Sequence, residues 1–227
     1  MGKLIAPLIF GAAGAAILIS LGVWQMQRLE WKQGVLAEIQ ARINDAPVAV
    51  PVQPDPEGDR FLPVAAQGEL TGEYLRVLVS QKRVGAGYRI ISAFETEGRR
   101  ILVDRGFMPV QSDDTPAAQG QVAYVGNLHW PEEVDSYTPA PDLAQNLWFA
   151  RDVPAMADAL NTEPVLLIAR AATPADAAIA PLPVSTEGIP NDHLNYAITW
   201  FSLAIVWLGM TAFLAWRIRR EQTQKAT

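Results

Sequence analysis

Two long apolar segments without charge, one near each end of the chain, most constrain what this sequence can fold into. Residues 4–27 carry no charge, and neither do residues 193–216 when His193 is neutral, so each segment is 24 residues long. An α-helix rises about 1.5 Å per residue, so each segment would extend roughly 36 Å as a helix, enough to cross a hydrocarbon core about 30 Å thick. The sequence therefore predicts transmembrane helices at 4–26 and 193–216.

The first apolar segment also invites the interpretation of a cleaved secretory signal. It is longer than the roughly 7–15 apolar residues of a signal sequence, and no small-x-small cleavage site follows it. The helical spacing continues beyond it through Leu29, Leu36, Ile39 and Ile43. We therefore expect an uncleaved anchor that extends as an amphipathic helix to about Asn44.

The distribution of charge predicts the orientation of the two spans. Basic residues dominate the predicted tail 217–227, and Lys3 lies in the short segment 1–3 before the first span, so the positive-inside bias places both termini in the cytoplasm. Arg28 and Lys32 oppose this bias locally. Residues 24–192 contain 13 basic and 23 acidic residues, and this net acidity argues against nucleic acid as a partner. The tail carries Arg217, Arg219, Arg220, Glu221 and Lys225.

Several kinds of active site are excluded by composition. The chain has no cysteine and only two histidines, His129 and His193, so Cys/His zinc sites, iron–sulfur clusters and Cys–His nucleophile pairs cannot form. The acid pairs Asp113-Asp114 and Glu132-Glu133 are interpreted as solvated loop faces. The sequence predicts that the chain is not an enzyme, although a carboxylate-based site stays open.

The region between the spans is predicted to be rich in β-strands. A helical extension and proline-rich linker at 27–60 precede a β-rich domain at 61–171, and an alanine- and proline-rich linker follows at 172–192. The predicted fold is a membrane protein in which two transmembrane α-helices flank a periplasmic α+β domain, mainly antiparallel sheet. Strands are expected at 70–81, 88–95, 100–104, 121–130 and 165–171, and a short helix at 154–161.

Aromatic and basic residues gather where the first span ends. Trp24, Arg28 and Trp31 share one helical face, and Lys32 lies one turn beyond Arg28. An aromatic belt with basic side chains that reach the headgroups explains this composition without any binding site. The alternative is a site for an anionic ligand at the outer membrane surface.

The second span begins with a polar cluster that includes a histidine. Asn191 is expected to cap the helix, and Asp192 suits the positive end of the helix dipole. His193, Tyr196 and Trp200 then share a face. The cluster is either an interfacial anchor bonded to water and headgroups or a ligand site.

Imidazole is a common axial ligand of haem iron, so the functional interpretation of the two clusters is a haem site. In this hypothesis His193 binds the iron, and Tyr196, Trp200 and Trp24 lie around the macrocycle. The propionates would point outward to the cations Arg28 and Lys32.

Three motifs in this chain resemble those of the Surfeit-locus family of cytochrome c oxidase assembly proteins. They are LGxWQxxRLxWK at 21–32, LVDRGFMP at 102–109 and PNxHLxYAxTW at 190–200. Their order and the two-span layout also match, so the resemblance covers nearly the whole chain. This chain departs from the family pattern at Asp104 and Phe107, where Asn and Trp are frequent, which leaves the role of Asp104 open.

The resemblance implies an assembly factor for a haem-copper terminal oxidase in a bacterial inner membrane. It implies that the protein binds haem a, with His193 as the ligand, and aids its insertion into the catalytic subunit of the oxidase. That subunit, haem a synthase and the lipid bilayer are the partners it suggests. Arg105-Gly106 is either part of a functional motif or the end of a strand followed by a turn.

Two other functions remain open from the sequence. The first is a structural scaffold for oxidase subunits that does not bind haem. The second is a periplasmic ligand-binding module tethered to the membrane, although only about ten residues follow Arg217, too few for a cytoplasmic output domain.

Overall fold

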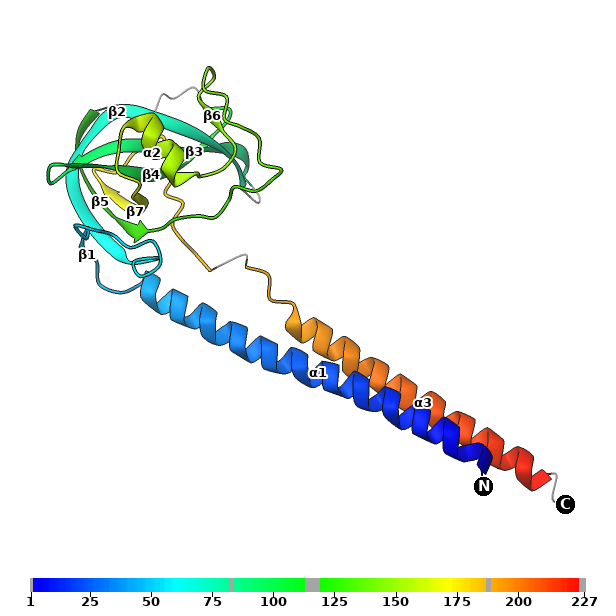
Figure 1. The fold of residues 1–227 in the computed structure, drawn as a ribbon. Helices are drawn as coiled ribbons and strands as arrows, with labels where there is room; N and C mark the ends of the chain where they lie inside the picture. The colour runs from blue at the N-terminus through cyan, green and yellow to red at the C-terminus, as the bar shows by residue number, and fades with distance from the viewer. Residues whose placement is uncertain (1, 82–83, 113–118, 187–188, 225–227) are drawn as a thin grey trace. The chain divides into compact units, whose positions relative to one another are not determined.

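The computed structural model describes residues 2–81, 84–112, 119–186 and 189–224, so Asp113-Asp114 and Lys225 lie outside the described residues. Its chain divides into two compact units, one of residues 1–38 with 187–227 and one of residues 39–186. Figure 1 shows the elements, which are α1 (Gly2–Ile43), β1 (Val48–Ala49), β2 (Pro63–Gln81), β3 (Gly85–Thr96), β4 (Arg99–Pro109), β5 (Gln119–Leu128), β6 (Leu147–Trp148), α2 (Val153–Leu160), β7 (Leu166–Thr173) and α3 (His193–Gln224).

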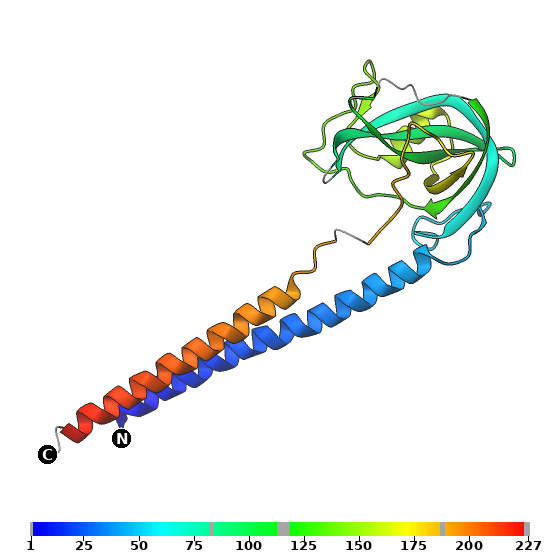
Figure 2. The ribbon, with the colours of Figure 1, turned by 180° about the vertical axis from the view of Figure 1, so that it is seen from behind.

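The first unit is an antiparallel hairpin of α1 and α3, which lie side by side in both views (Figures 1 and 2). Small residues let the helices approach closely: a Cβ added at Gly14 would lie 2.5 Å from the Trp207 ring, and one at Gly22 would lie 2.6 Å from Phe201. The Trp207 indole N–H donates to the Gly11 carbonyl at 2.9 Å. By length and composition both helices can cross a membrane.

The second unit is a closed β-barrel with short additions. The strand order is β2-β3-β4-β7-β5, and β5 pairs again with β2, which closes the ring. The two-residue strands β1 and β6 both pair with β2. Closure leaves the five main strands paired on both sides, and paired edges cannot recruit another chain.

The sheet is mixed, which corrects the expectation of a mainly antiparallel sheet. Four pairings among the described strands are antiparallel, β2–β3, β3–β4, β2–β5 and β5–β7, whereas β4–β7, β1–β2 and β2–β6 are parallel. The long connection between β5 and β7, which contains α2, lets β7 return between β5 and β4 and run parallel to β4. The alternation of apolar and polar residues along a strand does not indicate which other strand it will pair with, so the sequence pattern could not predict that β7 lies beside β4.

β2 curves enough to pair with two different strands. Its first half pairs with β5 and its second half with β3, and the register with β3 shifts between Leu70 and Tyr74. Gly72 lies inside this shift with φ of 89°, a left-handed conformation that glycine adopts at little steric cost. The expected strand at 70–81 is therefore the second half of a longer strand that starts at Pro63.

β4 and β7 are buried on both faces because two hydrophobic clusters lie on opposite sides of them. Side chains from all five main strands, among them Phe94, Val103 and Leu167, fill the barrel interior. On the outer face, Leu102 and Leu166 pack against Met156 of α2. This double burial explains the nearly continuous apolar runs in these two strands.

Local signals place the helices as expected. α1 ends at Ile43, which agrees with the predicted extension to about Asn44. The expected helix at 154–161 is α2, with the Asp152 carboxylate accepting from the Ala155 N–H at its start and Asn161 in a left-handed conformation at its end.

The end of α1 is bound to the barrel by two side chains. The Asn127 amide, which has no solvent exposure, donates to the Ile43 carbonyl and to the Phe61 carbonyl, each at 3.0 Å. Arg170 donates to the same Ile43 carbonyl at 3.2 Å. A cation and an amide thus satisfy a helix-terminal carbonyl, where the helix dipole is negative.

Candidate functional site

The helical hairpin positions the His193 imidazole by a hydrogen bond from the opposite helix. His193 is the first residue of α3, and its Nδ1 lies 2.7 Å from Oε1 of Gln25 in α1. Gln25 is buried, with 8% of its surface exposed. Because a carbonyl oxygen accepts only, Nδ1 is the donor in this hydrogen bond, and Nε2 of a neutral ring keeps its lone pair. Among the described residues no partner contacts Nε2, so this nitrogen is available as a metal ligand.

Lys32 lies at the same end of the hairpin as His193. Its ammonium group donates to the Pro190 carbonyl, three residues before the imidazole. Gln25 and Lys32 are seven residues apart in α1 and therefore share the face that meets α3. These two contacts bring Lys32 and His193 to the same end of the hairpin.

The other predicted site residues of the first span lie on a different face of α1. Trp24 and Trp31 are each 53% exposed, and the Arg28 guanidinium lies 3.9 Å from the centre of the Trp31 ring. This cation–π contact is the interaction that a basic residue one turn from a tryptophan makes on a helix surface. Trp24, Arg28 and Trp31 thus form an exposed face of α1.

Tyr196 and Trp200 differ in exposure although both follow His193 on α3. Tyr196 is 57% exposed, whereas Trp200 is half-buried near the buried Ala197. The structure therefore brings together His193, Lys32 and Gln25, and it leaves Trp24, Arg28 and Tyr196 on the surface of the hairpin.

Two details of the hairpin differ from the sequence-based expectations. The helix starts at His193, and the Tyr196 N–H donates to the Asp192 carbonyl, so Asp192 and not Asn191 occupies the cap position. Gln25 belongs to the first motif but was given no role from the sequence. The sequence signal for Gln25 was its seven-residue spacing from Lys32, which puts the two residues on one face of the helix. That spacing indicates a role only once the structure shows that this face packs against α3.

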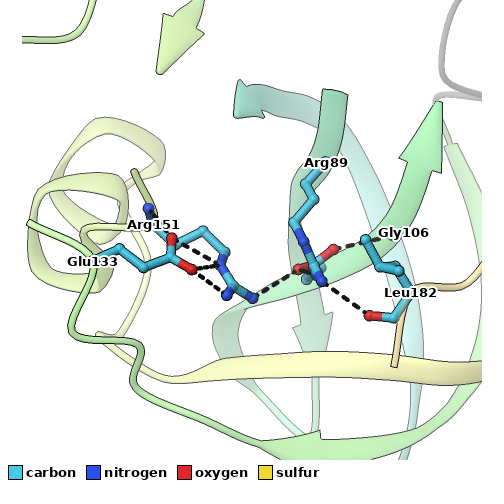
Figure 3. Close-up of polar contacts among 6 residues, drawn as sticks. Arg89, Gly106, Glu133, Arg151 and Leu182 are labelled. Atoms are coloured by element: carbon cyan, nitrogen blue, oxygen red, sulfur yellow. Dashed lines mark hydrogen bonds and ion pairs between the residues drawn. The ribbon is translucent and has the colours of Figure 1, made fainter. Parts of the chain in front are cut away.

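A row of alternating charges runs from Glu133 and Arg151 to Arg89 (Figure 3). Asp104 of β4 has no solvent exposure and pairs with Arg89 of β3. The Asp104 carboxylate also accepts from the Gly106 N–H at 3.1 Å and lies 3.6 Å from Arg151, which pairs with Glu133. Two carboxylates and two guanidinium groups therefore balance within the row.

The environment of the row shifts the acidity of its carboxyl groups. Burial raises the pKa of Asp104, and the charges of Arg89 and Arg151 act in the opposite direction. Hydrogen bonds and charge from Arg151 outweigh burial at Glu133, so the pKa of Glu133 is lowered. Both acids lie in a loop and are exposed, as expected from the sequence: the Glu132 side chain is 86% exposed, and the Glu133 side chain, although paired with Arg151, is 38% exposed.

Arg105 and Gly106 lie inside β4, which continues to Pro109. The interpretation of these residues as a strand end followed by a turn is therefore wrong. Arg105 has 4% of its side chain exposed and pairs with Asp176, and Gly106 has φ of 124°. The second motif is thus a strand whose charged residues, Asp104 and Arg105, are buried and paired.

His129 is the second histidine and adjoins the charged row. Its ring stacks on Phe61 with 4.9 Å between ring centres, and its buried Nδ1 has no hydrogen-bond partner within the described residues. Burial, with the charges of Arg151 and Arg60 added, lowers the pKa of His129 to about 4. The imidazole is therefore neutral at pH 7.

The chemistry available at the two places differs. No group of three or more Asp, Glu or His side chains in the described residues could hold a metal ion without a prosthetic group. The charged row pairs its charges internally and presents no hydroxyl or amine nucleophile, which is typical of a structural network. The hairpin offers one imidazole nitrogen without a hydrogen bond to the described residues, and a nearby ammonium group, which fits a ligand that brings its own metal and carries an anionic group.

The fold and the hairpin define a class of protein in which a closed barrel is carried between two apolar helices and an imidazole begins the second helix. The profile of the SURF1 family matches residues 12–205. The chain therefore belongs to the SURF1 family.

Relatives from bacteria and from animals show the same extended similarity. A SURF1-like protein of Rickettsia felis is 32% identical over 205 residues, which cover 83% of this chain and 88% of that protein. Surfeit locus protein 1 of Xenopus tropicalis is 31% identical over 209 residues, 81% of this chain and 67% of that protein. The Homo sapiens protein of the same name is 27% identical over 209 residues, 81% of this chain and 69% of that protein.

The lowered pKa of His129 predicts a measurable pH dependence of stability. Between pH 6.5 and about 4 the unfolded chain binds a proton on His129 that the folded chain does not, so the free energy of unfolding falls as the pH falls. His129→Phe keeps the ring contact with Phe61 and removes the titration. The free energy of unfolding of this variant, measured on the full chain in detergent, should depend less steeply on pH in this window than that of the wild type. The difference between the two slopes corresponds to at most about one bound proton. Equal slopes for wild type and variant would contradict the assignment.

Proposed function

We propose that this protein is an assembly factor for a haem-copper terminal oxidase that binds haem a through His193 and aids its insertion into the catalytic subunit. Membership in the SURF1 family supports the role in oxidase assembly. The observation that carries the haem hypothesis is the hydrogen bond between His193 Nδ1 and Gln25, which leaves Nε2 for the iron.

The contacts at the hairpin fit an axial haem ligand. Metal-binding histidines usually donate their second nitrogen to a carbonyl or carboxylate, which fixes the tautomer and the ring orientation. Gln25 supplies such a carbonyl oxygen here. Haem would supply the iron that accepts the Nε2 lone pair, and Lys32 would hold a propionate, with Arg28 on the neighbouring face as a second cation.

The remaining predicted residues would act as surroundings of the macrocycle. Trp200 is half-buried about two turns beyond His193 on α3, whereas Tyr196 on α3 and Trp24 on α1 present exposed aromatic surface. In this proposal the catalytic subunit of the oxidase receives the haem and haem a synthase supplies it. The alternative is a scaffold that contacts oxidase subunits without binding haem. Family membership supports this alternative too, but it gives the Nε2 atom of His193 no role.

The proposed location is the bacterial inner membrane, with the barrel in the periplasm and both termini in the cytoplasm. The two apolar helices and the similarity to the Rickettsia felis protein support it. Because the chain has no cysteine, single cysteines can report the orientation. A membrane-impermeant maleimide should label Tyr137→Cys in intact spheroplasts and Gln224→Cys only after permeabilisation. The reverse pattern would overturn the orientation.

The haem site is tested by the absorption spectrum of protein purified from cells that make haem a. Wild type should show a Soret band close to one haem per chain that shifts on reduction, and His193→Ala should lose it. Gln25→Leu should reduce haem affinity roughly 10–100-fold, the usual effect of removing the hydrogen bond that orients a ligand. Gln27→Leu, at an exposed position two residues away, serves as the matched control. An equal Soret band in wild type and His193→Ala would remove the ligand assignment.

The assembly role is tested by complementation of a strain that lacks the gene. Deletion should lower oxidase activity and the haem a content of the catalytic subunit while other membrane complexes persist, and the wild-type chain should restore both. The His193→Ala chain should restore neither. Full restoration by that variant would favour the scaffold, and normal oxidase in the deletion strain, with no paralogue present, would contradict the role itself.

A further inference from the structure

Two pockets of the barrel unit adjoin each other beside α2. The larger pocket has a volume of about 710 Å³ and lies between the loop that contains Glu57, the segment 130–134 and the start of α2. The smaller pocket has a volume of about 260 Å³ and lies between the segments 138–141 and 148–150 and the start of α2. Val134 and Asp152 line both pockets, so one ligand can occupy the two together.

The smaller pocket is mainly apolar. Prolines, alanines and the rings of Trp148 and Phe149 make up most of its lining. Trp148 is 4% exposed and belongs to the same hydrophobic cluster as Met156 of α2, so this lining is supported by the core. At the border of the pocket, Val134 is 56% exposed and Phe149 is 37% exposed. An apolar side chain of a partner would remove this surface from water, which favours binding.

The larger pocket is mainly acidic. Arg60 is the one basic residue that lines it, and it pairs with Glu132 at 2.7 Å. Glu133 pairs with Arg151 at one end of the charged row that Figure 3 shows. These pairs neutralise two of the carboxylates in the lining. The acidic residues of the lining are Glu57, Glu132, Glu133 and Asp152.

The other two carboxylates of the larger pocket have no cation of their own. Within the part of the chain that the structure describes, neither Glu57 nor Asp152 forms an ion pair, and Glu57 is exposed. The Oδ1 atom of Asp152 accepts from the Ala155 N–H at 3.2 Å. An ionised carboxylate has two accepting oxygens, so Asp152 can hold the start of α2 and still bind a second donor.

The charge of this surface selects among possible occupants. Two carboxylates without a cation favour a basic group and oppose an anionic one. Anionic lipid headgroups would therefore be repelled, and so would a second copy of the chain that presents the same acidic surface. A polypeptide fits because neighbouring side chains of one segment can enter adjacent pockets.

We propose that the two pockets form a docking surface for a polypeptide segment of a partner protein in which an apolar residue lies close to basic residues. The apolar side chain occupies the smaller pocket, and the basic side chains pair with Glu57 and Asp152 in the larger one. Val134 separates the two subsites and contacts the segment between them. The surface belongs to the barrel unit alone and does not involve His193, so the proposal goes beyond the proposed function.

The test measures binding of defined peptides to the full chain in phosphatidylcholine nanodiscs, with empty nanodiscs subtracted. The probes are fluorescent Gly/Ser peptides that carry one Phe or Leu and two Lys at varied spacings. Matched peptides replace both Lys by Glu, or the apolar residue by Ser. Peptides with both features should bind with an affinity that falls as salt is added, and the two matched sets should bind at least roughly ten-fold more weakly.

Substitutions then locate the binding. Val134→Lys places a cation between the subsites and should weaken binding roughly ten-fold or more. Val52→Lys is its control, because Val52 is 84% exposed and lines neither pocket.

The acidic subsite needs its own pair of substitutions. Glu57→Gln with Asp152→Asn removes both charges and keeps a residue that can cap α2, and it should weaken binding about three- to ten-fold. Glu69→Gln with Asp158→Asn is the control, since both acids are exposed and line neither pocket.

The outcomes separate the proposal from its alternatives. Failure of every probe to bind, equal binding of the Glu peptides, or equal affinity of wild type and folded Val134→Lys overturns the docking surface. Equal binding of apolar peptides with and without Lys would indicate an apolar site only and would also overturn it. If Val134→Lys does not fold, Ala140→Lys, at an exposed position that lines the smaller pocket, takes its place. Haem takes no part in these measurements, so they stand or fall independently of the haem hypothesis.

Discussion

The pairing of β5 with the first half of β2 is the constraint on which the domain depends, because it turns a curved sheet into a closed barrel. Closure buries β4 and β7 on both faces and fixes their neighbours. A polar residue on such a strand must find its partners inside the protein, since water cannot reach it. Asp104 and Arg105 meet this demand with Arg89 and Asp176, and these ion pairs connect separate parts of the fold.

The two compact units use polar contacts for different ends. In the hairpin, a single hydrogen bond between Gln25 and His193 defines a tautomer and leaves one nitrogen unengaged. In the barrel, carboxylates pair with guanidinium groups, so the charged row has few groups left to bind or react with a ligand. This contrast places the proposed ligand chemistry in the hairpin, whereas the second motif holds the chain that follows β7 through Asp176 and Ala180.

Much of the architecture was predictable because it follows from local periodicity and charge. The apolar spans, the helical extension that ends at Ile43, the short helix α2 and all five main strands are patterns that a few residues carry. Two expectations failed for one reason. The parallel pairing of β4 with β7 and the continuation of β4 through Arg105 and Gly106 depend on which distant segments become neighbours, and no local pattern records that choice.

The sequence by itself determined the elements and the lone imidazole at the start of the second span. Hydrophobic periodicity and the absence of cysteine are properties of the chain before it folds. Only the tertiary structure decided that His193 meets Gln25, 168 residues away, that Trp24 and Arg28 face outward, and that Gly106 makes room for the backbone of Ala180. The physical reason is that the burial and the hydrogen-bond partners of a residue depend on segments that are distant in the sequence. Those segments become neighbours only when the chain folds.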